Sequence, residues 1–214
     1  MGVVVVGVDI GQKYDPTAIA VVEHEWRKRD GREEDHWLIR HLERLPLGTP
    51  YPQVADRLEE VVGNVKKRRS EVREPLPWGG YEVRTVTPSV TIYVDATGVG
   101  QPVVDEMATR GPWVVAVYFT HGDKRTEEGW RTVKLGKVWL VSRMQTLLQA
   151  GRIHLPNTQE THDLAQELLD YEIRVSEDAN DRYGAFKVGT HDDLVTALGL
   201  AVQRVPWQPL IARA

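Results

Sequence analysis

The stretch Val3-Val4-Val5-Val6-Gly7-Val8-Asp9 opens the chain with β-branched residues and ends in a carboxylate. A run that is apolar at nearly every position predicts a central strand covered on both faces of its sheet. Residues 90–94 repeat this pattern and lead to Asp95. A carboxylate that closes a buried strand is costly unless a cation or a hydrogen-bond donor faces it, and α/β sheets form their sites at strand ends. Asp9 and Asp95 are therefore candidate site residues.

The patterns on either side of these two strands predict an α/β fold, a mixed sheet flanked by helices. Residues 3–8, 17–25 and 36–45 are expected to form a three-strand antiparallel meander with a charged turn at 26–35, and 90–94 and 114–119 to add parallel strands. Expected helices span 53–69, 102–111, 133–150, 158–171 and 191–204. We further expect an insertion or mobile loop at 71–89, a surface loop at 120–132, a short extended piece at 153–155, and a β-hairpin at 171–188 near the C-terminal helix. One domain, 1–206, and a tail, 207–214, account for the whole chain.

The composition is that of an ordinary folded domain and removes several kinds of chemistry. The chain has 214 residues, 41% hydrophobic and 27% charged, with a formal net charge of −4. It has no cysteine, which excludes disulfides, thiolate metal sites and cysteine nucleophiles. No apolar run approaches the roughly 18 residues of a membrane helix, and the apolar start lacks a basic leader, so we expect no membrane and an intracellular setting. Negative net charge counts mildly against nucleic-acid binding, unless the basic residues gather on one face.

A third acidic signal, Asp192-Asp193, opens a stretch whose apolar residues recur at helical spacing. On a helical wheel Asp193 falls nearer the apolar stripe, and Asp192 points further toward solvent. Taken singly, each aspartate has an ordinary explanation, as a turn residue after a strand or as a residue that the dipole favours at a helix start. Taken together, two aspartates at strand ends and one at a buried helix start indicate a shared acidic site.

Carboxylates gathered in one site repel one another, and a divalent cation relieves that repulsion. Ligands that are all oxygen favour Mg²⁺ or Mn²⁺ over zinc. Two such cations about 3.5–4 Å apart can activate a water and stabilise the leaving oxygen of a phosphodiester, so no protein nucleophile is needed. The sequence therefore favours metal-dependent phosphodiester hydrolysis.

At these residues the chain resembles the nuclease domain of bacteriophage large terminases, which are DNA-packaging motor proteins of the ribonuclease H-like type. The three acidic motifs of that family are resembled, in order, by Val6-Gly7-Val8-Asp9-Ile10-Gly11, by Tyr93-Val94-Asp95-Ala96-Thr97-Gly98-Val99-Gly100 and by Gly189-Thr190-His191-Asp192-Asp193-Leu194-Val195-Thr196-Ala197-Leu198. The third is the most specific, and together they cover nearly the whole chain. The resemblance implies that Asp9, Asp95 and Asp193 are catalytic ligands of two Mg²⁺ or Mn²⁺ ions. It further implies that Asp192 is a ligand or supports one, and that Asp15 is an auxiliary acid.

The family's biology is carried over as an expectation. The resemblance implies an endonuclease that cuts double-stranded viral DNA during genome packaging in the cytoplasm of an infected bacterial host. Its implied partners are the DNA, an ATPase motor domain, a portal protein and a small terminase, and the hairpin at 171–188 is expected near the DNA. The chain lacks the Gly-x-x-x-x-Gly-Lys-Ser/Thr loop of the motor. It is therefore expected to be an excised C-terminal domain, which its start directly before the first strand favours, or a free-standing relative.

Basic residues near the expected site are candidates for phosphate contact, because loops beside strand ends carry function. The candidates are Lys124, Arg125, Arg131, Lys134 and Lys137 in the loop and helix start after residue 119, and Arg174 and Arg182 on the hairpin. A solvated basic loop explains them about equally well. The run Lys66-Lys67-Arg68-Arg69 is better explained as a solvated helix end that complements the dipole.

Three other functions remain open from the residues alone. An actin-like ATPase half also begins with a strand and Asp-x-Gly, and nucleotide binding would favour it. Another ribonuclease H-like nuclease, such as a Holliday-junction resolvase or a transposase, would share the acidic site. A non-catalytic DNA-docking module would bind DNA but would not depend on Asp95.

Overall fold

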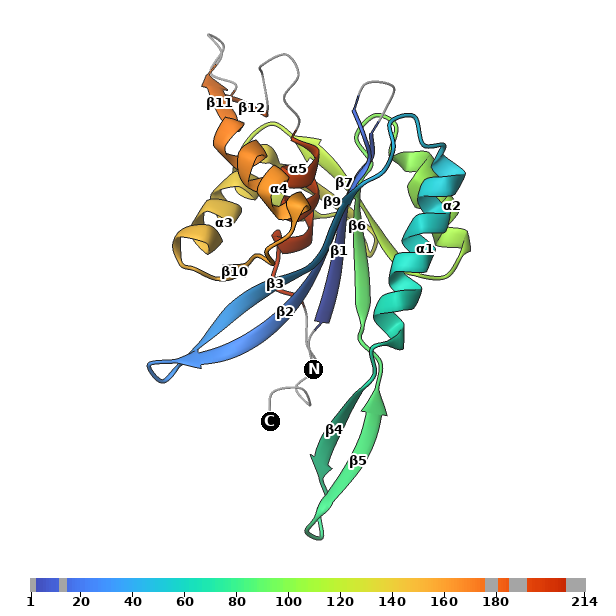
Figure 1. Cartoon of the computed structure of the whole chain (residues 1–214), viewed down its shortest axis with the longest axis vertical. Coiled ribbons are helices and arrows are strands. Elements are labelled where there is room, and N and C mark those ends of the chain that lie inside the picture. Colours follow the sequence, from blue (N-terminus) through green and yellow to red (C-terminus); the bar gives the residue numbers. More distant parts are fainter. Residues whose placement is uncertain (1–2, 12–14, 176–180, 185–191, 207–214) are drawn as a thin grey trace.

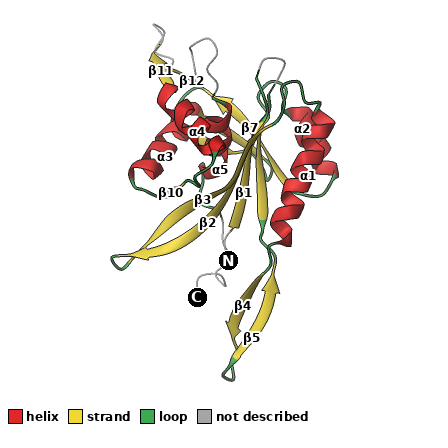
Figure 2. Cartoon of the chain, viewed as in Figure 1, coloured by secondary structure: helices red, strands yellow, loops and turns green. Residues whose placement is uncertain are grey.

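Eight strands form one mixed sheet among the residues that the structure, a computed structural model, describes: 3–11, 15–175, 181–184 and 192–206 (Figures 1 and 2). The strands are β1 (Val3–Asp9), β2 (Ala18–Arg29), β3 (Arg32–Arg44), β6 (Val90–Asp95), β7 (Trp113–Thr120), β8 (Arg125–Glu127), β9 (Thr132–Gly136) and β10 (Ile153–His154). Their order across the sheet is β10-β3-β2-β1-β6-β7-β9-β8. β1, β2 and β3 are antiparallel, and β1, β6, β7 and β9 run parallel. This arrangement confirms the predicted meander with added parallel strands.

Five helices cover the two faces of the sheet in the described part of the chain (Figure 1). They are α1 (Tyr51–Lys67), α2 (Gln101–Thr109), α3 (Lys137–Gln149), α4 (Gln159–Asp170) and α5 (Asp193–Val202). α1 and α2 pack on one face, and α3, α4 and α5 pack on the other. None of these described helices is both long and apolar enough to cross a membrane.

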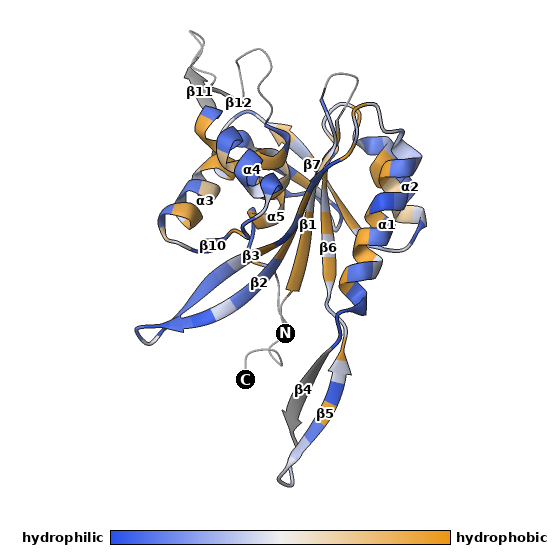
Figure 3. Cartoon of the chain, in the orientation of Figure 1, coloured by the Kyte–Doolittle hydropathy of each residue, from blue (hydrophilic) through white to orange (hydrophobic). Residues whose placement is uncertain are grey.

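The first strand supplies side chains to both cores, as its apolar sequence predicts. Because successive side chains of a strand point to opposite faces, Val4, Val6 and Val8 enter the core under α1 and α2, and Val5 enters the core under α3, α4 and α5. Figure 3 shows apolar colour concentrated in the central strands and polar colour on the far ends of β2 and β3. The centre of the sheet is therefore the most deeply covered part of the molecule.

Helix α5 lies closer to the sheet than a side chain would permit. A Cβ atom added at Gly7 would fall 2.0 Å from the backbone oxygen of Ala197 and 2.7 Å from the backbone nitrogen of Ala201. Nine of the ten residues of α5 are buried, as expected for a helix enclosed on all sides. Gly7 is thus required for the approach of α5 to β1.

Three segments contain strands that the sequence did not predict. The insertion or mobile loop expected at 71–89 is an insertion that contains a hairpin of β4 (Ser70–Pro75) and β5 (Tyr81–Val86), which projects away from the sheet (Figure 1). The expected helix at 133–150 begins only at Lys137, because residues 132–136 form β9. The loop at 120–132 carries the short strand β8, which pairs with β9.

Two expected elements are found with changed limits. The turn at 26–35 is shorter, since β2 and β3 continue to Arg29 and Arg32 and leave only Asp30 and Gly31 between them. The hairpin near the C-terminal helix is formed by β11 (Glu172–Val175) and β12 (Asp181–Gly184). Within the expected hairpin at 171–188, residues 176–180 and 185–188 lie outside the described residues, as does the tail 207–214.

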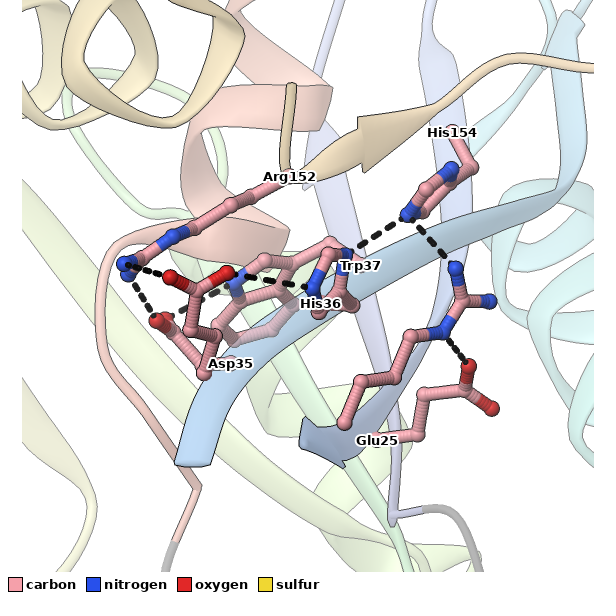
Figure 4. A network of polar contacts seen from close by, with 8 residues as sticks. Glu25, Asp35, His36, Trp37, Arg152 and His154 are labelled. Carbon is pink, nitrogen blue, oxygen red and sulfur yellow. Dashed lines mark hydrogen bonds and ion pairs between the residues drawn. The ribbon is translucent and has the colours of Figure 1, made fainter. Parts of the chain in front are cut away.

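A buried aspartate, Asp35 on β3, joins the sheet to α3 and to the segment before β10. Figure 4 shows its contacts with Trp37 and Arg152. Asp35 accepts hydrogen bonds from the indole of Trp37 at 3.2 Å, from Arg143 at 3.0 Å and from Arg152 at 2.7 Å. Burial alone would raise the pKa of Asp35, but the hydrogen bonds from Trp37 and Arg143 and the charge of the two arginines hold it below its usual value. Asp35 is therefore ionised and central to this network.

Gly7→Ala is expected to destabilise the fold by about 3 kcal/mol or more, because the new methyl would meet backbone atoms, which no side-chain rotation can move aside. Gly63→Ala is the matched control, since a Cβ there meets nothing within 4 Å in the interior of α1, and it should stabilise the protein by about 0.5–1 kcal/mol. Urea denaturation of both variants measures the difference. Equal stabilities would show that α5 does not lie against β1.

Asp35→Ala is expected to lower the free energy of unfolding by about 3–5 kcal/mol at pH 7, because it leaves two arginines without their buried partner. The pKa of Asp35 is lowered in the folded protein, so its contribution is present above the unfolded pKa and is lost as the pH falls through the folded value. The loss should therefore shrink in acid. Glu33→Gln, an exposed change two residues away, should have almost no effect in the same denaturation series.

Candidate metal centre

The register of two parallel strands places Asp9 beside Asp95. Val8 pairs with Val94, so the next residue on each strand lies opposite the other, and neighbouring strands are about 4.8 Å apart. Val8 and Val94 enter the core under α1 and α2. Alternation then directs both aspartates to the opposite face, the one that α5 covers.

The packing of α5 on β1 brings a third carboxylate to the same place. Ala197 lies against Gly7, Asp193 is one helical turn before Ala197, and Asp9 is two residues beyond Gly7 on the strand. Asp193 and Asp9 are therefore about equally far from the contact between Ala197 and Gly7, because one turn of helix and two residues of strand both span about 5–7 Å. This places Asp193 near Asp9. The side chain of Asp193 is buried, with the residue 4% exposed.

The electrostatics of the carboxylates agree with this placement. Burial raises the pKa of Asp9 well above its ordinary value, and the negative charges of Asp95, Asp193 and Asp192 raise it further. Burial also raises the pKa of Asp95, although the hydroxyl and the backbone N–H of Thr97 and the charge of nearby Lys137 oppose the rise. The Asp95 carboxylate accepts the Thr97 N–H at 2.8 Å.

The environment of Asp193 strongly disfavours its charged form. Burial, followed by the charges of Glu167, Asp192 and Asp15, raises the pKa of Asp193 to about 7 against the opposing charge of Arg44. Asp15 is exposed but still acts on Asp193, and Asp192 precedes the first residue of α5 and acts on Asp9 as well. Electrostatic interactions thus link Asp9 with Asp95, Asp192 and Asp193, and they link Asp15 with Asp193.

The donor set suits a hard divalent cation. Every carboxylate here is an oxygen donor, and the site gathers more negative charge than Lys137 and Arg44 can offset. Within the described residues, no group of three or more acidic or histidine side chains is arranged so that it could hold a metal ion as it stands. The residues therefore fit an oxygen-ligated cation by the chemistry of their donors.

Two residues that the sequence analysis missed belong to this neighbourhood. Glu167 on α4 is 5% exposed and forms an ion pair with Arg44 at the end of β3. Arg44 also approaches Asp193, with 3.8 Å between Nε and Oδ2. A signal was present, because Glu167 falls on the same helical stripe as the buried Thr161 and Leu164, and a charged residue on an apolar stripe needs a partner.

Of the basic residues named as DNA contacts, Lys137 is the one tied directly to the acids. Its charge lowers the pKa of Asp9 and of Asp95, and its ammonium lies 5.4 Å from the ring of Phe119. Lys124 is exposed, in the loop whose backbone bonds to the end of β9. Both lysines therefore stay candidates for contact with phosphate.

The other basic candidates are placed away from the acids or lie outside the described side chains. Arg125 donates a hydrogen bond to Gln203 at 2.9 Å and forms an ion pair with Glu127. Gln203 lies ten residues after Asp193, which is about 15 Å along a helix, so Arg125 is far from the acids. Arg131 lies over Trp113 at the opposite end of β7 from the partner of Asp95, and Lys134 pairs with Glu128. Arg174 and Arg182 are paired in register on the hairpin, and their side chains are not described.

Asp193→Asn is expected to stabilise the metal-free protein at pH 8 by about 1–3 kcal/mol, because a carboxylate with a raised pKa opposes folding once it is ionised. The folded protein holds this proton to about pH 7 and the unfolded chain releases it near pH 4, so wild-type stability should fall across that window relative to the variant. Chemical denaturation in EDTA from pH 4 to 8 measures the difference. Parallel curves for the two proteins would contradict the placement of Asp193 among the acids.

No protein-family model matches the chain, and no curated protein matches its sequence. Solved structures do match its fold. The large terminase nuclease from thermophilic phage G20c with bound magnesium aligns at a TM-score of 0.59 and 20% identity, covering 95% of this chain and 82% of that one. The Thermus phage P74-26 large terminase nuclease domain aligns at a TM-score of 0.57 and 18% identity, covering 94% of this chain and 78% of that one. The HK97 bacteriophage large terminase aligns at a TM-score of 0.57 and 12% identity, covering 95% of this chain and 39% of that one. The chain therefore has the fold of large terminase nuclease domains, as its motifs predict.

Proposed function

We propose that this protein is a divalent-metal-dependent DNA endonuclease of the large terminase type. The observation that carries the proposal is that Asp9 and Asp95, at the carboxyl ends of the central strands β1 and β6, lie in the electrostatic reach of Asp193 at the start of α5. The same fold is found in the G20c large terminase nuclease, which has been solved with bound magnesium and with bound cobalt. A shared fold and an oxygen-rich acidic cluster together favour this activity over other roles of the fold.

The proposed roles rest on the resemblance to large terminase nucleases, and the placement of the aspartates supports them. Asp9, Asp95 and Asp193 would hold two Mg²⁺ or Mn²⁺ ions, with Asp192 as a further ligand or a support for one and Asp15 as an auxiliary acid. Bound ions of this kind activate water and stabilise the leaving oxygen in phosphodiester hydrolysis. Lys137, which faces Asp9 and Asp95, would offset charge at the site and, with Lys124, attract the phosphate backbone of DNA.

The proposed substrate is double-stranded viral DNA, cut during genome packaging in the cytoplasm of an infected bacterial host. An ATPase motor domain, a portal protein and a small terminase are the partners that this role requires. The HK97 large terminase supports this context, because the chain matches 39% of that longer protein. A motor domain would hold DNA against the nuclease, so the isolated chain is expected to cut slowly.

Wild-type protein is expected to nick and linearise plasmid DNA with Mn²⁺ or Mg²⁺ and to lose this activity in EDTA. Asp9→Asn, Asp95→Asn and Asp193→Asn should each reduce cutting by at least about 100-fold, because each removes a charged ligand, whereas Glu33→Gln on the exposed far end of β3 should not. Gel electrophoresis of supercoiled plasmid measures the rates. Metal-independent cutting, or full activity in an aspartate variant, would refute the assignment.

Metal binding can be tested without cleavage. Mn²⁺ at about 100 times its Kd should stabilise the wild-type protein by about 2.7 kcal/mol, seen as a raised melting temperature, and should leave Asp9→Asn unchanged. The same melting measurements can include ATP, and stabilisation by ATP instead would favour an actin-like ATPase half. The cleavage assay can include a four-way DNA junction, and preferential cutting of the junction would favour a resolvase.

A further inference from the structure

Helix α5 begins without a hydrogen bond to the side chain of its own N-cap residue. Asp192 occupies the N-cap position but makes no capping hydrogen bond to the helix, and the first N–H groups of any helix have no partner within it. The cap comes from another helix, since Glu167 of α4 accepts the backbone N–H of Val195 at 3.0 Å. A carboxylate at this end of a helix is also favoured by the helix dipole.

The second oxygen of Glu167 is held by an arginine from the opposite direction. Arg44, the last residue of β3, forms an ion pair with Glu167 and lies 3.6 Å from Asp163, which is one turn earlier on α4. The Nε atom of Arg44 is buried, has no hydrogen-bond partner among the described residues, and is 3.8 Å from Asp193 Oδ2. The guanidinium of Arg44 thus contacts α4 and also lies close to Asp193, the first residue of α5.

This pair connects three elements at the point where the acidic site is completed. β3 supplies Arg44, α4 supplies Glu167, and α5 supplies both the capped Val195 and the buried Asp193. A shift at the start of α5 would move Asp193 relative to Asp9 on β1, because they belong to different elements. Repulsion among the site carboxylates works to produce such a shift, and the contacts of Glu167 and Arg44 oppose it.

We propose that Arg44 and Glu167 form a clamp that positions Asp193 for cation binding, without either residue being a ligand. This Arg44–Glu167 clamp rests on the proposed function, since it acts on a ligand assigned there. Residues that orient a metal ligand commonly change metal affinity by about 10-fold to 100-fold when replaced. The clamp is therefore expected to act on the affinity for the ion more than on the rate once the ion is bound.

The test compares Mn²⁺ binding, by calorimetry, with plasmid cutting at saturating Mn²⁺. Glu167→Ala should weaken Mn²⁺ binding by about 10-fold or more and recover most of the cutting rate at saturation. Glu167→Gln has one oxygen for two donors, so it can keep the Val195 N–H contact but loses the ion pair with Arg44, and it should weaken Mn²⁺ binding less than Glu167→Ala does. Glu167→Ala with wild-type affinity would overturn the clamp, and Glu167→Gln as defective as Asp193→Asn would make Glu167 a ligand instead.

Arginine variants keep the test valid where Glu167→Ala does not fold. Arg44→Lys retains the charge but loses the planar fork that reaches Glu167 and Asp193 together, so it should weaken Mn²⁺ binding. Arg40→Lys, at the exposed ion pair with Glu23, is the matched control and should bind as the wild type does; equal affinity for both would overturn the clamp. A wild-type protein that neither binds Mn²⁺ nor cuts would refute the proposed function itself, whereas an active wild type with unaffected clamp variants would refute only the clamp.

Discussion

The direct contact between the backbone of β1 and the backbone of α5 is the constraint on which the site depends. At Gly7 there is no room for even one side-chain carbon, so the helix rests on the strand itself. The close packing of α5 on β1 determines how far Asp193 lies from the end of β1, where Asp9 is beside Asp95. The two cores on either side of the sheet keep this arrangement rigid, because α1 and α2 support the strands from behind.

The site and the rest of the fold use charge in opposite ways. Asp35 is buried with three hydrogen-bond donors, and these lower its pKa. Asp9, Asp95 and Asp193 are instead buried near other carboxylates, and burial is the main cause of their raised pKa values. A protein that keeps such a group of acids loses stability in the absence of a cation, and sites of this kind are where function is commonly found.

The sequence indicated most of this architecture, and its failures have physical causes. Short runs rich in β-branched residues, each closed by an aspartate, were sufficient to identify β1 and β6, because their length and their β-branched content favour a buried strand over a helix. Residues 133–136 were assigned to a helix because Val133 and Leu135 alternate directly into the apolar residues of α3, and only Gly136 separates the two patterns. The hairpin of β4 and β5 carries exposed Trp78 and Tyr81, so no alternation between buried and exposed faces marks it. Glu167 was missed because its partners, Arg44 and Val195, are distant in sequence and adjacent only in the folded chain.

The central claim is that carboxylates from β1, β6 and α5 form one cation site. Crystals grown with Mn²⁺ and measured at the manganese absorption edge test it most directly, because the anomalous signal locates the ion without assumptions about the protein. The account predicts the strongest peaks among Asp9, Asp95 and Asp193, and their absence from crystals of Asp9→Asn. Peaks only at exposed acids, such as Asp56 and Glu59 on α1, with none among the three aspartates, would contradict it.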